Sequence, residues 1–318
     1  MIDIKNQLNL TLEKFNCNSL GKHYKGKVRD NYYDGNKIIM ITSDRVSAFD
    51  HVLGTIPFKG QILTEIANFW FNKTQHIAPN HIISSPDPQV LIAKKAKTLP
   101  VEVIVRNYIT GSLWREYSSG INGQYGFDLA NNLKKNQKFD KPILTPSTKA
   151  EYGLHDEPIS REKIINGLVD ENIYYQAEEY ALQLFNEGKK WADNQGLILV
   201  DTKYEFGIVD NQLIVIDEIH TPDSSRFWVK KEYEDRFIRG ESQKMLDKEN
   251  IRQWLIEKGF SGKGTPPKLT DEIRVSLAEY YIELYNTLLG KEFVPESGDV
   301  KVRVINNLNN YGYNIDSF

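Results

Sequence analysis

The spacing of apolar residues along the chain predicts both β-strands and amphipathic helices. Apolar residues alternate with others in 101–105 and form a short run in 197–200, and both patterns are typical of buried strands. Apolar positions three or four residues apart in 173–184 and 273–288 instead predict helices with one core-facing side, the second ending at Gly290. No internal repeat interrupts this order. The pattern favours a mixed α+β protein.

The stretch "GKHYKGKV", Gly21–Val28, comes within one residue of a nucleotide-binding P-loop. A P-loop requires Ser or Thr where this chain has Val28, and its phosphate cradle must open a helix. Here Asp34-Gly35 separates two strand-like runs, which predicts a β-hairpin in place of a helix. Two interpretations remain open: a solvated basic turn, or a hairpin loop over ATP phosphates, as in protein kinases.

Two turns that contain serine each carry an arginine. Arg106 ends the strand-like run before Ser112, and Arg226 follows Asp223 and Ser224 in "TPDSSRFW". A guanidinium beside a hydroxyl and turn amides is suited to bind phosphate or carboxylate. The alternative for the first turn is that Arg106 pairs with a nearby carboxylate and Ser112 caps a helix; the second turn could equally cap a helix.

Three carboxylates and a lysine are expected on one face of a second hairpin. In "LVDTKYEFG" the side chains of Asp201, Lys203 and Glu205 share one face of a strand. If the turn at Asp210-Asn211 has three residues, Asp217 lies opposite Glu205. Such oxygen clusters suit Mg²⁺, which proteins hold by one or two carboxylates together with substrate phosphates. The alternative is an exposed charged face with an internal ion pair.

Composition excludes several classes of function. The chain has 318 residues, with 40 Lys and Arg against 43 Asp and Glu, so no overall positive charge attracts nucleic acid. Cys17 is the only cysteine, which fits a reducing compartment and excludes a disulfide framework. No secretory leader or membrane span is apparent. We therefore expect a cytoplasmic protein that binds small molecules and neither nucleic acid nor membrane, as a monomer or small homo-oligomer.

Several motifs together carry a resemblance to a known family. "GKVRD", "SDRVSAFD", "LPVEVIVRNYITGS", "LHDEPIS", "LVDTKYEFG" and "DEIHTPDSSRFW" occur in the order found in the SAICAR synthetase family of purine biosynthesis. The resemblance spans 21–228, and the remainder resembles the longer form of the family. It implies ATP-dependent joining of L-aspartate to carboxyaminoimidazole ribonucleotide (CAIR), with ATP as co-substrate and Mg²⁺ as cofactor. Activation of the CAIR carboxylate as an acyl phosphate is the expected chemistry.

The resemblance also implies roles for individual residues. Those similar to the ATP-binding positions are Gly26, Lys27, Arg29 and Glu102. Those similar to the CAIR-binding positions are Arg106, Ser112, Asp223, Ser224 and Arg226. The expected catalytic residues are Lys203, Asp201 and Glu205, and the expected metal ligands are Asp201, Glu205 and Asp217. Loops expected to close over the substrates carry Asp44, Arg45, Ser47, Asp50, His155 and Asp156.

The expected architecture has two lobes, in a kinase-like or ATP-grasp-like arrangement. An antiparallel sheet lobe over 1–100 bears the phosphate-binding loop, and a larger mixed α/β lobe over 101–318 bears the metal and CAIR sites. ATP is expected between them, and the C-terminal helices are expected on the larger lobe. Two alternatives remain: a kinase, although the His-Arg-Asp and Asp-Phe-Gly segments of protein kinases are missing, and a nucleotide-sensing module without catalysis.

Overall fold

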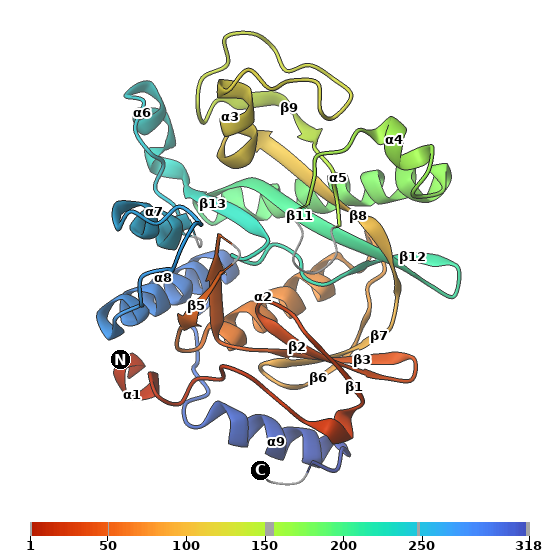
Figure 1. Ribbon diagram of the computed structural model, residues 1–318, viewed down its shortest axis with the longest axis vertical. Helices are drawn as coiled ribbons and strands as arrows, with labels where there is room; N and C mark the ends of the chain where they lie inside the picture. Colours follow the sequence, from red (N-terminus) through yellow and green to blue (C-terminus); the bar gives the residue numbers. More distant parts are fainter. Residues whose placement is uncertain (1, 50, 150–155, 247–248, 316–318) are drawn as a thin grey trace. The chain divides into compact units, whose positions relative to one another are not determined.

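The computed structural model describes residues 2–49, 51–149, 156–246 and 249–315 (Figure 1). The chain divides into two compact units. Unit 1 comprises Met1–Phe69, His81–Lys95 and Leu246–Phe318, and unit 2 comprises Trp70–Asn80 and Ala96–Met245. Antiparallel sheets and helices occur in both, which confirms the α+β class.

An antiparallel sheet forms the centre of unit 1. Its strand order is β1-β2-β3-β7-β6, made of β1 (Lys22–Lys25), β2 (Arg29–Asp34), β3 (Lys37–Thr42), β7 (Val90–Lys94) and β6 (Ile82–Asp87). Strands β4 (Arg45–Ala48) and β5 (His51–Thr55) form a separate hairpin. Asp34 pairs with Lys37, so the predicted hairpin exists and its two-residue turn is Gly35-Asn36, with Gly35 at φ 59°.

The helices of unit 1 include the C-terminal part of the chain. They are α1 (Ile4–Gln7), η1 (Asn18–Leu20), α2 (Lys59–Thr74), whose last residues belong to unit 2, α7 (Glu249–Glu257), α8 (Asp271–Leu289) and α9 (Val300–Tyr311). Gly290 ends α8 in the left-handed conformation, as predicted. Val304 and Leu308 of α9 share one apolar core with Ile39 and Ile41 of β3. The C-terminal helices therefore pack in unit 1, and not on the larger lobe as expected, because the apolar side of α9 covers this sheet.

A second antiparallel sheet organises unit 2. Its order is β10 (Ser147–Thr148), β8 (Lys97–Tyr108), β11 (Leu197–Val209) and β12 (Gln212–Ile216); β13 (Ser225–Val229) also pairs with β11, and β9 (Lys138–Leu144) with β8. The helical elements are α3 (Gly111–Ser118), α4 (Arg161–Ile165), α5 (Glu171–Asn194), η2 (Lys230–Glu232) and α6 (Tyr233–Ile238). The long α5 runs along β8 and β11 (Figure 1).

The two faces of β8 and β11 differ in chemistry. The hydroxyl of Tyr204 contacts His220, whose ring lies against Gly188 of α5, so Tyr204 and its cross-strand neighbour Val103 face this helix. Both side chains are fully buried. Because side chains alternate along a strand, Lys203 and its neighbours at every second position face the other way. That second face carries the charged residues predicted from the sequence.

The turn between β11 and β12 differs from its prediction. Asp210 and Asn211, at φ 50° and 62°, form a two-residue turn of the type that matches the natural twist of a hairpin. Glu205 is therefore opposite Ile216, and Asp217 lies one residue beyond the end of β12. The predicted pairing of Asp217 with Glu205 is wrong by one residue.

Within the ranges that the structure describes, no helix is both long and apolar enough to cross a membrane.

Candidate active site

A lysine lies between two glutamates on the charged face of the unit 2 sheet. Glu102 of β8 and Glu205 of β11 are direct cross-strand partners, and Lys203 lies two residues before Glu205 on the same face. The Lys203 Nζ atom is 2.7 Å from Glu102 Oε1 and 2.9 Å from Glu205 Oε1. Lys149, just after β10, donates to the other carboxylate oxygen, Oε2, of Glu205. These four residues are called the lysine–glutamate cluster below.

Burial and charge act against each other in this cluster. Burial lowers the pKa of Lys203, but the carboxylates of Glu205, Glu102 and Asp217 outweigh burial and raise that pKa well above its usual value. Burial raises the pKa of Glu102; the ammonium of Lys203 opposes that rise, and the nearby charge of Glu205 adds to it. For Glu205 the neighbouring ammonium groups outweigh burial, so its pKa lies below the usual range. At neutral pH Lys203 is an ammonium, and Glu102 and Glu205 orient it.

Two arginines converge on one aspartate further along the same face. Asp201 of β11 is the cross-strand partner of both Arg106 on β8 and Arg226 on β13. Their Nη1 atoms lie 3.3 Å and 2.9 Å from the same Asp201 oxygen, Oδ2. Arg106 also donates to the hydroxyls of Thr145 at 2.8 Å and Ser112 at 3.2 Å. Two guanidinium groups against one carboxylate leave an excess positive charge, which suits an anionic ligand.

The start of α3 is shaped to accommodate one of these arginines. Gly111 has φ +58°, and a Cβ atom at this position would lie too close to a guanidinium nitrogen of Arg226, so one of them would have to move. Thr110 is the N-cap residue of α3, so Ser112 lies in the first turn of the helix and does not cap it. Its hydroxyl instead accepts from Arg106, as stated above. The capping interpretation of Ser112 is therefore wrong, whereas the other part of that alternative, the pairing of Arg106 with a carboxylate, is confirmed.

The turn before β13 is held by its own hydroxyl groups. Thr221 donates to Glu218 at 2.7 Å, and the Ser224 hydroxyl accepts from the Thr221 amide at 3.2 Å. The carbonyl of Ser224 accepts from the Lys203 amide at 3.0 Å, which connects this turn to the lysine–glutamate cluster. Asp223 lies between Thr221 and Ser224 in the chain, and its side chain is half-buried. The turn thus has a fixed position beside β11, immediately before Arg226.

The basic loop in unit 1 is a turn between two strands. Residues 26–28 connect β1 to β2, and the Gly26 amide donates to the Arg29 carbonyl at 2.8 Å. The Lys27 side chain is exposed, whereas Arg29 is buried at the start of β2. Strands, and not a helix, flank the loop, which confirms the rejection of the P-loop.

Asp44 and Arg45 of the "SDRVSAFD" segment are buried, whereas side chains that close over a substrate must be able to reach it. The carboxylate of Asp44 accepts from the Leu12 amide at 2.7 Å and from the Gly60 amide at 2.9 Å, and burial raises its pKa to about 6. Arg45 is only 1% exposed, while Ser47 is half-buried on β4. Asp44 and Arg45 therefore bind groups of the protein itself. Of the other residues expected to close over substrates, Asp156 is exposed, and Asp50 and His155 lie outside the described residues.

The three predicted metal ligands do not form one compact group. Among the described residues, no three His, Cys, Asp or Glu side chains are arranged to hold a metal ion. Asp201 and Glu205 are four residues apart on one strand, so their Cα atoms are separated by about 13 Å. The Asp201 carboxylate is paired with two guanidinium groups. Asp217 instead lies close enough to Lys203 to raise the pKa of that lysine. Asp217 is therefore grouped with the lysine–glutamate cluster, apart from Asp201.

Sequence reasoning missed two residues of the site. Lys149 contacts Glu205, and Thr145 contacts Arg106. Both belong to a segment whose pairing with β8 brings Ser147 opposite Glu102. The segment is short and polar, so the apolar pattern gave no signal for this strand pairing.

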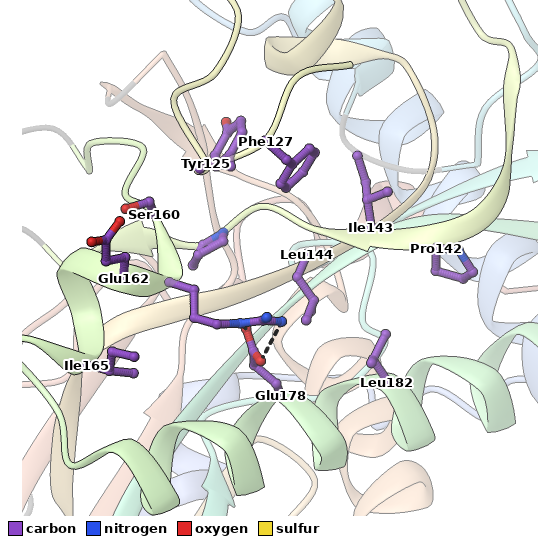
Figure 2. A pocket seen from close by; sticks show the side chains of 13 residues that line it. Tyr125, Phe127, Pro142, Ile143, Leu144, Ser160, Glu162, Ile165, Glu178 and Leu182 are labelled. Carbon is purple, nitrogen blue, oxygen red and sulfur yellow. Dashed lines mark hydrogen bonds and ion pairs between the residues drawn. The ribbon is translucent and has the colours of Figure 1, made fainter. Parts of the chain in front are cut away.

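A separate cavity of about 610 Å³ lies among β9, α4, α5 and the loop that carries Tyr125 and Phe127 (Figure 2). Arg161 lines this cavity and donates to Glu178 of α5 at 3.0 Å. Among the described residues that line it, Arg161 supplies the cation, and most of the others are apolar. A dicarboxylate such as aspartate needs positive charge that is not already paired, and Arg161 is paired with Glu178, so this cavity does not suit the amino acid that the resemblance implies.

Comparisons with known sequences point to one family. A model of the SAICAR synthetase family matches residues 22–268. The phosphoribosylaminoimidazole-succinocarboxamide synthase of Cytophaga hutchinsonii is 49% identical over 290 residues, which cover 90% of this chain and 93% of the relative. The protein of the same name from Bacteroides thetaiotaomicron is 45% identical over 308 residues, covering 95% of this chain and 98% of the relative.

Solved structures agree with the sequence relatives. The SAICAR synthase of Saccharomyces cerevisiae, complexed with SAICAR, matches with a TM-score of 0.79 and 34% identity, over 89% of this chain and 99% of that one. A SAICAR synthetase in complex with ADP matches with a TM-score of 0.65 and 27% identity, over 86% of this chain and 100% of that one. With most of its length matched by the family model and by close relatives, the chain belongs to the SAICAR synthetase family.

Proposed function

We propose that this protein joins L-aspartate to CAIR by way of an acyl phosphate, with the lysine–glutamate cluster at the reacting carboxylate. Its family membership makes it an ATP-dependent ligase of de novo purine biosynthesis, which forms SAICAR. The observation that carries the assignment of residues is the division of one sheet face into two charged groups. One has an excess of guanidinium, and the other alternates ammonium and carboxylate groups.

The arginine pair is proposed to bind the phosphate of CAIR. A phosphate monoester carries nearly two negative charges at neutral pH, and a guanidinium matches its oxygens with two parallel hydrogen bonds. Asp201 holds Arg106 and Arg226 in place while balancing part of their charge. The hydroxyl of Ser112, already in contact with Arg106, supports the same role. Asp223 and Ser224 lie on the adjoining turn and are proposed to contact the ribose or the amine.

Lys203 is proposed to bind the CAIR carboxylate or the phosphoryl group that is transferred to it. An oxygen of the carboxylate attacks the γ-phosphorus of ATP, and ADP departs, which leaves an acyl phosphate. The neutral aspartate amine then attacks the acyl carbon, inorganic phosphate leaves with the bonding electrons, and the nitrogen loses a proton to solvent. A fixed ammonium stabilises the charge that develops on these oxygens. Glu102 and Glu205 hold Lys203 in its charged state and in a fixed position.

Mg²⁺ is proposed to bind beside Glu205 and Asp217, and not at Asp201. Glu102, Glu205 and Asp217 carry three negative charges when ionised, against two positive charges on Lys149 and Lys203, so this region keeps a net negative charge. Carboxylate oxygens combined with phosphates are the ligands that Mg²⁺ prefers. When bound, the ion neutralises charge on the ATP phosphates. Lys27, exposed on the unit 1 loop, is proposed to bind ATP phosphates as well.

Positional isotope exchange tests the acyl phosphate. ATP labelled with ¹⁸O at the β,γ-bridging position is incubated with enzyme, Mg²⁺ and CAIR, without aspartate. Reversible phosphoryl transfer to CAIR predicts that the label moves into non-bridging positions of the β-phosphate in recovered ATP, and that omission of CAIR prevents this. Label that stays in the bridge, in a preparation that forms SAICAR once aspartate is added, would argue against reversible formation of the intermediate.

A further inference from the structure

A buried arginine in unit 1 contacts the backbone of the basic loop directly. Arg45 Nε donates to the Lys27 carbonyl at 3.0 Å, and its Nη2 donates to the Gly26 carbonyl at 3.1 Å. Its Nη1 donates to the Glu13 carbonyl at 2.5 Å and to Asp30 Oδ2 at 3.0 Å. Each nitrogen of the guanidinium thus has an acceptor within the protein, and the side chain lies out of contact with solvent.

These bonds fix the direction of two peptide units. In a planar trans peptide the N–H points away from the C=O of the same unit. Because the carbonyls of Gly26 and Lys27 point at Arg45, the amides of Lys27 and Val28 point away from it. Ser43 adds a third constraint, since both its amide and its hydroxyl donate to the Val28 carbonyl, at 2.9 Å and 2.7 Å. Consecutive amides held in this manner are a recurrent means of binding anions.

We propose that Arg45 is a positioning residue for ATP: it holds residues 26–28 in the conformation that presents Lys27 to the phosphates, without touching the nucleotide itself. This inference rests on the proposed role of Lys27. It also replaces the expectation that Arg45 closes over a substrate, because every nitrogen of its buried guanidinium already donates to an acceptor within the protein. A rigid arginine fork that bonds two successive carbonyls cannot be reproduced by the single ammonium of a lysine.

The choice of substitution follows from the buried partner. Asp30 is fully buried, and its Oδ2 atom also accepts from the Phe15 amide at 3.0 Å. An uncharged residue at position 45 would leave this carboxylate without a compensating charge and would endanger folding. Arg45→Lys retains the charge beside Asp30 but loses the fork. Ser43→Ala is a milder second variant, which removes one hydroxyl bond to the loop.

Arg274→Lys is the matched control. Arg274, also in unit 1, donates to the carbonyls of Thr55 at 2.8 Å and Leu8 at 2.6 Å, and its side chain is 15% exposed. It therefore resembles Arg45 in its bonds to backbone carbonyls, without contact to the basic loop. Arg45→Lys and Arg274→Lys are both expected to lower the unfolding temperature, and only Arg45→Lys is expected to raise the KM for ATP.

Steady-state kinetics and amide hydrogen exchange on the full-length enzyme test the inference. For Arg45→Lys we expect the KM for ATP to rise at least about tenfold, the KM for CAIR to stay within about twofold, and exchange at residues 26–29 to accelerate. Arg274→Lys should keep both KM values and the exchange of these amides. Ser43→Ala should raise the KM for ATP about threefold, and it decides the question if Arg45→Lys does not fold.

An unchanged KM for ATP in a folded Arg45→Lys enzyme would overturn the inference, as would a rise of equal size for CAIR. Lys27→Met separates the inference from the proposed role of the loop. If Lys27→Met keeps the KM for ATP while Arg45→Lys speeds amide exchange without any change in that KM, the loop does not bind ATP and both assignments fail. If Lys27→Met raises the KM and Arg45→Lys does not, the role of the loop stands and only the positioning role of Arg45 is lost.

Discussion

Arg106 and Arg226 donate to the same oxygen of Asp201, although 119 residues separate them in the chain (226 minus 106, less one). Both are cross-strand neighbours of Asp201, one on each side of β11. Antiparallel pairing on two sides thus collects three charges that no local motif joins. An anion that binds there meets two guanidinium groups held in place by a shared carboxylate.

Arg226→Lys should impair the binding of CAIR specifically. A lysine keeps the positive charge but loses the two-pronged contact with phosphate oxygens. We expect the KM for CAIR to rise at least about tenfold and the KM for ATP to stay within about twofold. Arg236→Lys, a change in an i,i+4 ion pair of unit 2, should leave both unchanged. Equal effects of Arg226→Lys on CAIR and ATP would place Arg226 at the phosphoryl-transfer centre.

Gly111→Ala should displace Arg226 without changing a charge. The new Cβ atom would clash with the guanidinium of Arg226, and the positive φ adds backbone strain. Gly120→Ala is the control, because Gly120 has φ +77° with no atom near the position of a Cβ. Both variants should lose stability in urea unfolding, and only Gly111→Ala should raise the KM for CAIR, by about tenfold or more. Similar kinetics in the two variants would contradict the packing role of Gly111.

Lys149→Met should slow catalysis, because Glu205 loses the partner of one carboxylate oxygen. Of the contacts in the lysine–glutamate cluster, only those of Lys203 with Glu102 and Glu205 then remain. We expect kcat to fall at least about tenfold, with the KM for CAIR within about threefold. Lys149→Arg should recover part of the rate, and Lys141→Met, on the exposed part of β9, should behave as wild type. A normal kcat in Lys149→Met would show that Lys149 has no role in catalysis.

His220 should make folding stability depend on pH. Its ring is fully buried between Tyr204, Trp70 and α5, and burial lowers its pKa to about 3. Below pH 6.5 the imidazole of His220 binds a proton in the unfolded chain but stays neutral in the folded chain. The free energy of unfolding therefore decreases as the pH falls from about 6.5 towards 3. The slope approaches about 1.4 kcal/mol per pH unit.

Urea unfolding between pH 4 and 7 measures this slope. His220→Gln should flatten it, even though the variant is less stable at pH 7, because a neutral amide takes up no proton. His76→Gln, at an exposed position of unit 2, should keep the wild-type slope. An equal slope in wild type and His220→Gln would show that His220 is not the group responsible.

The alternation of residues in 201–205 was sufficient to predict which side chains share a face, because the period of a strand is fixed. The alternation could not predict which residues of the neighbouring strands lie opposite these side chains. The register of β12 depends on Asp210 and Asn211 both adopting positive φ, which shortened the turn and moved Asp217 beyond the strand. Lys149 was missed since its position depends on the pairing of β10 with β8.

Burial of charge was the other feature that local patterns could not show. Asp44 and Arg45 resemble exposed loop residues in the sequence, yet each satisfies its hydrogen bonds inside unit 1. Their partners come from segments up to 45 residues away in the chain. The C-terminal helices were placed on the wrong lobe for a similar reason: an apolar helix side indicates burial but does not identify the sheet that covers it.

The central claim is that Lys203, held between Glu102 and Glu205, acts on the reacting groups while the arginine pair binds CAIR. The most direct measurement is SAICAR formation by Lys203→Met at saturating ATP, CAIR and aspartate, with CAIR affinity measured by calorimetry on the same preparation. We predict that kcat falls at least about a hundredfold, whereas the Kd for CAIR rises at most about tenfold because the arginine pair still holds the phosphate of CAIR. A kcat within tenfold of wild type, in a variant that binds CAIR normally, would contradict the account.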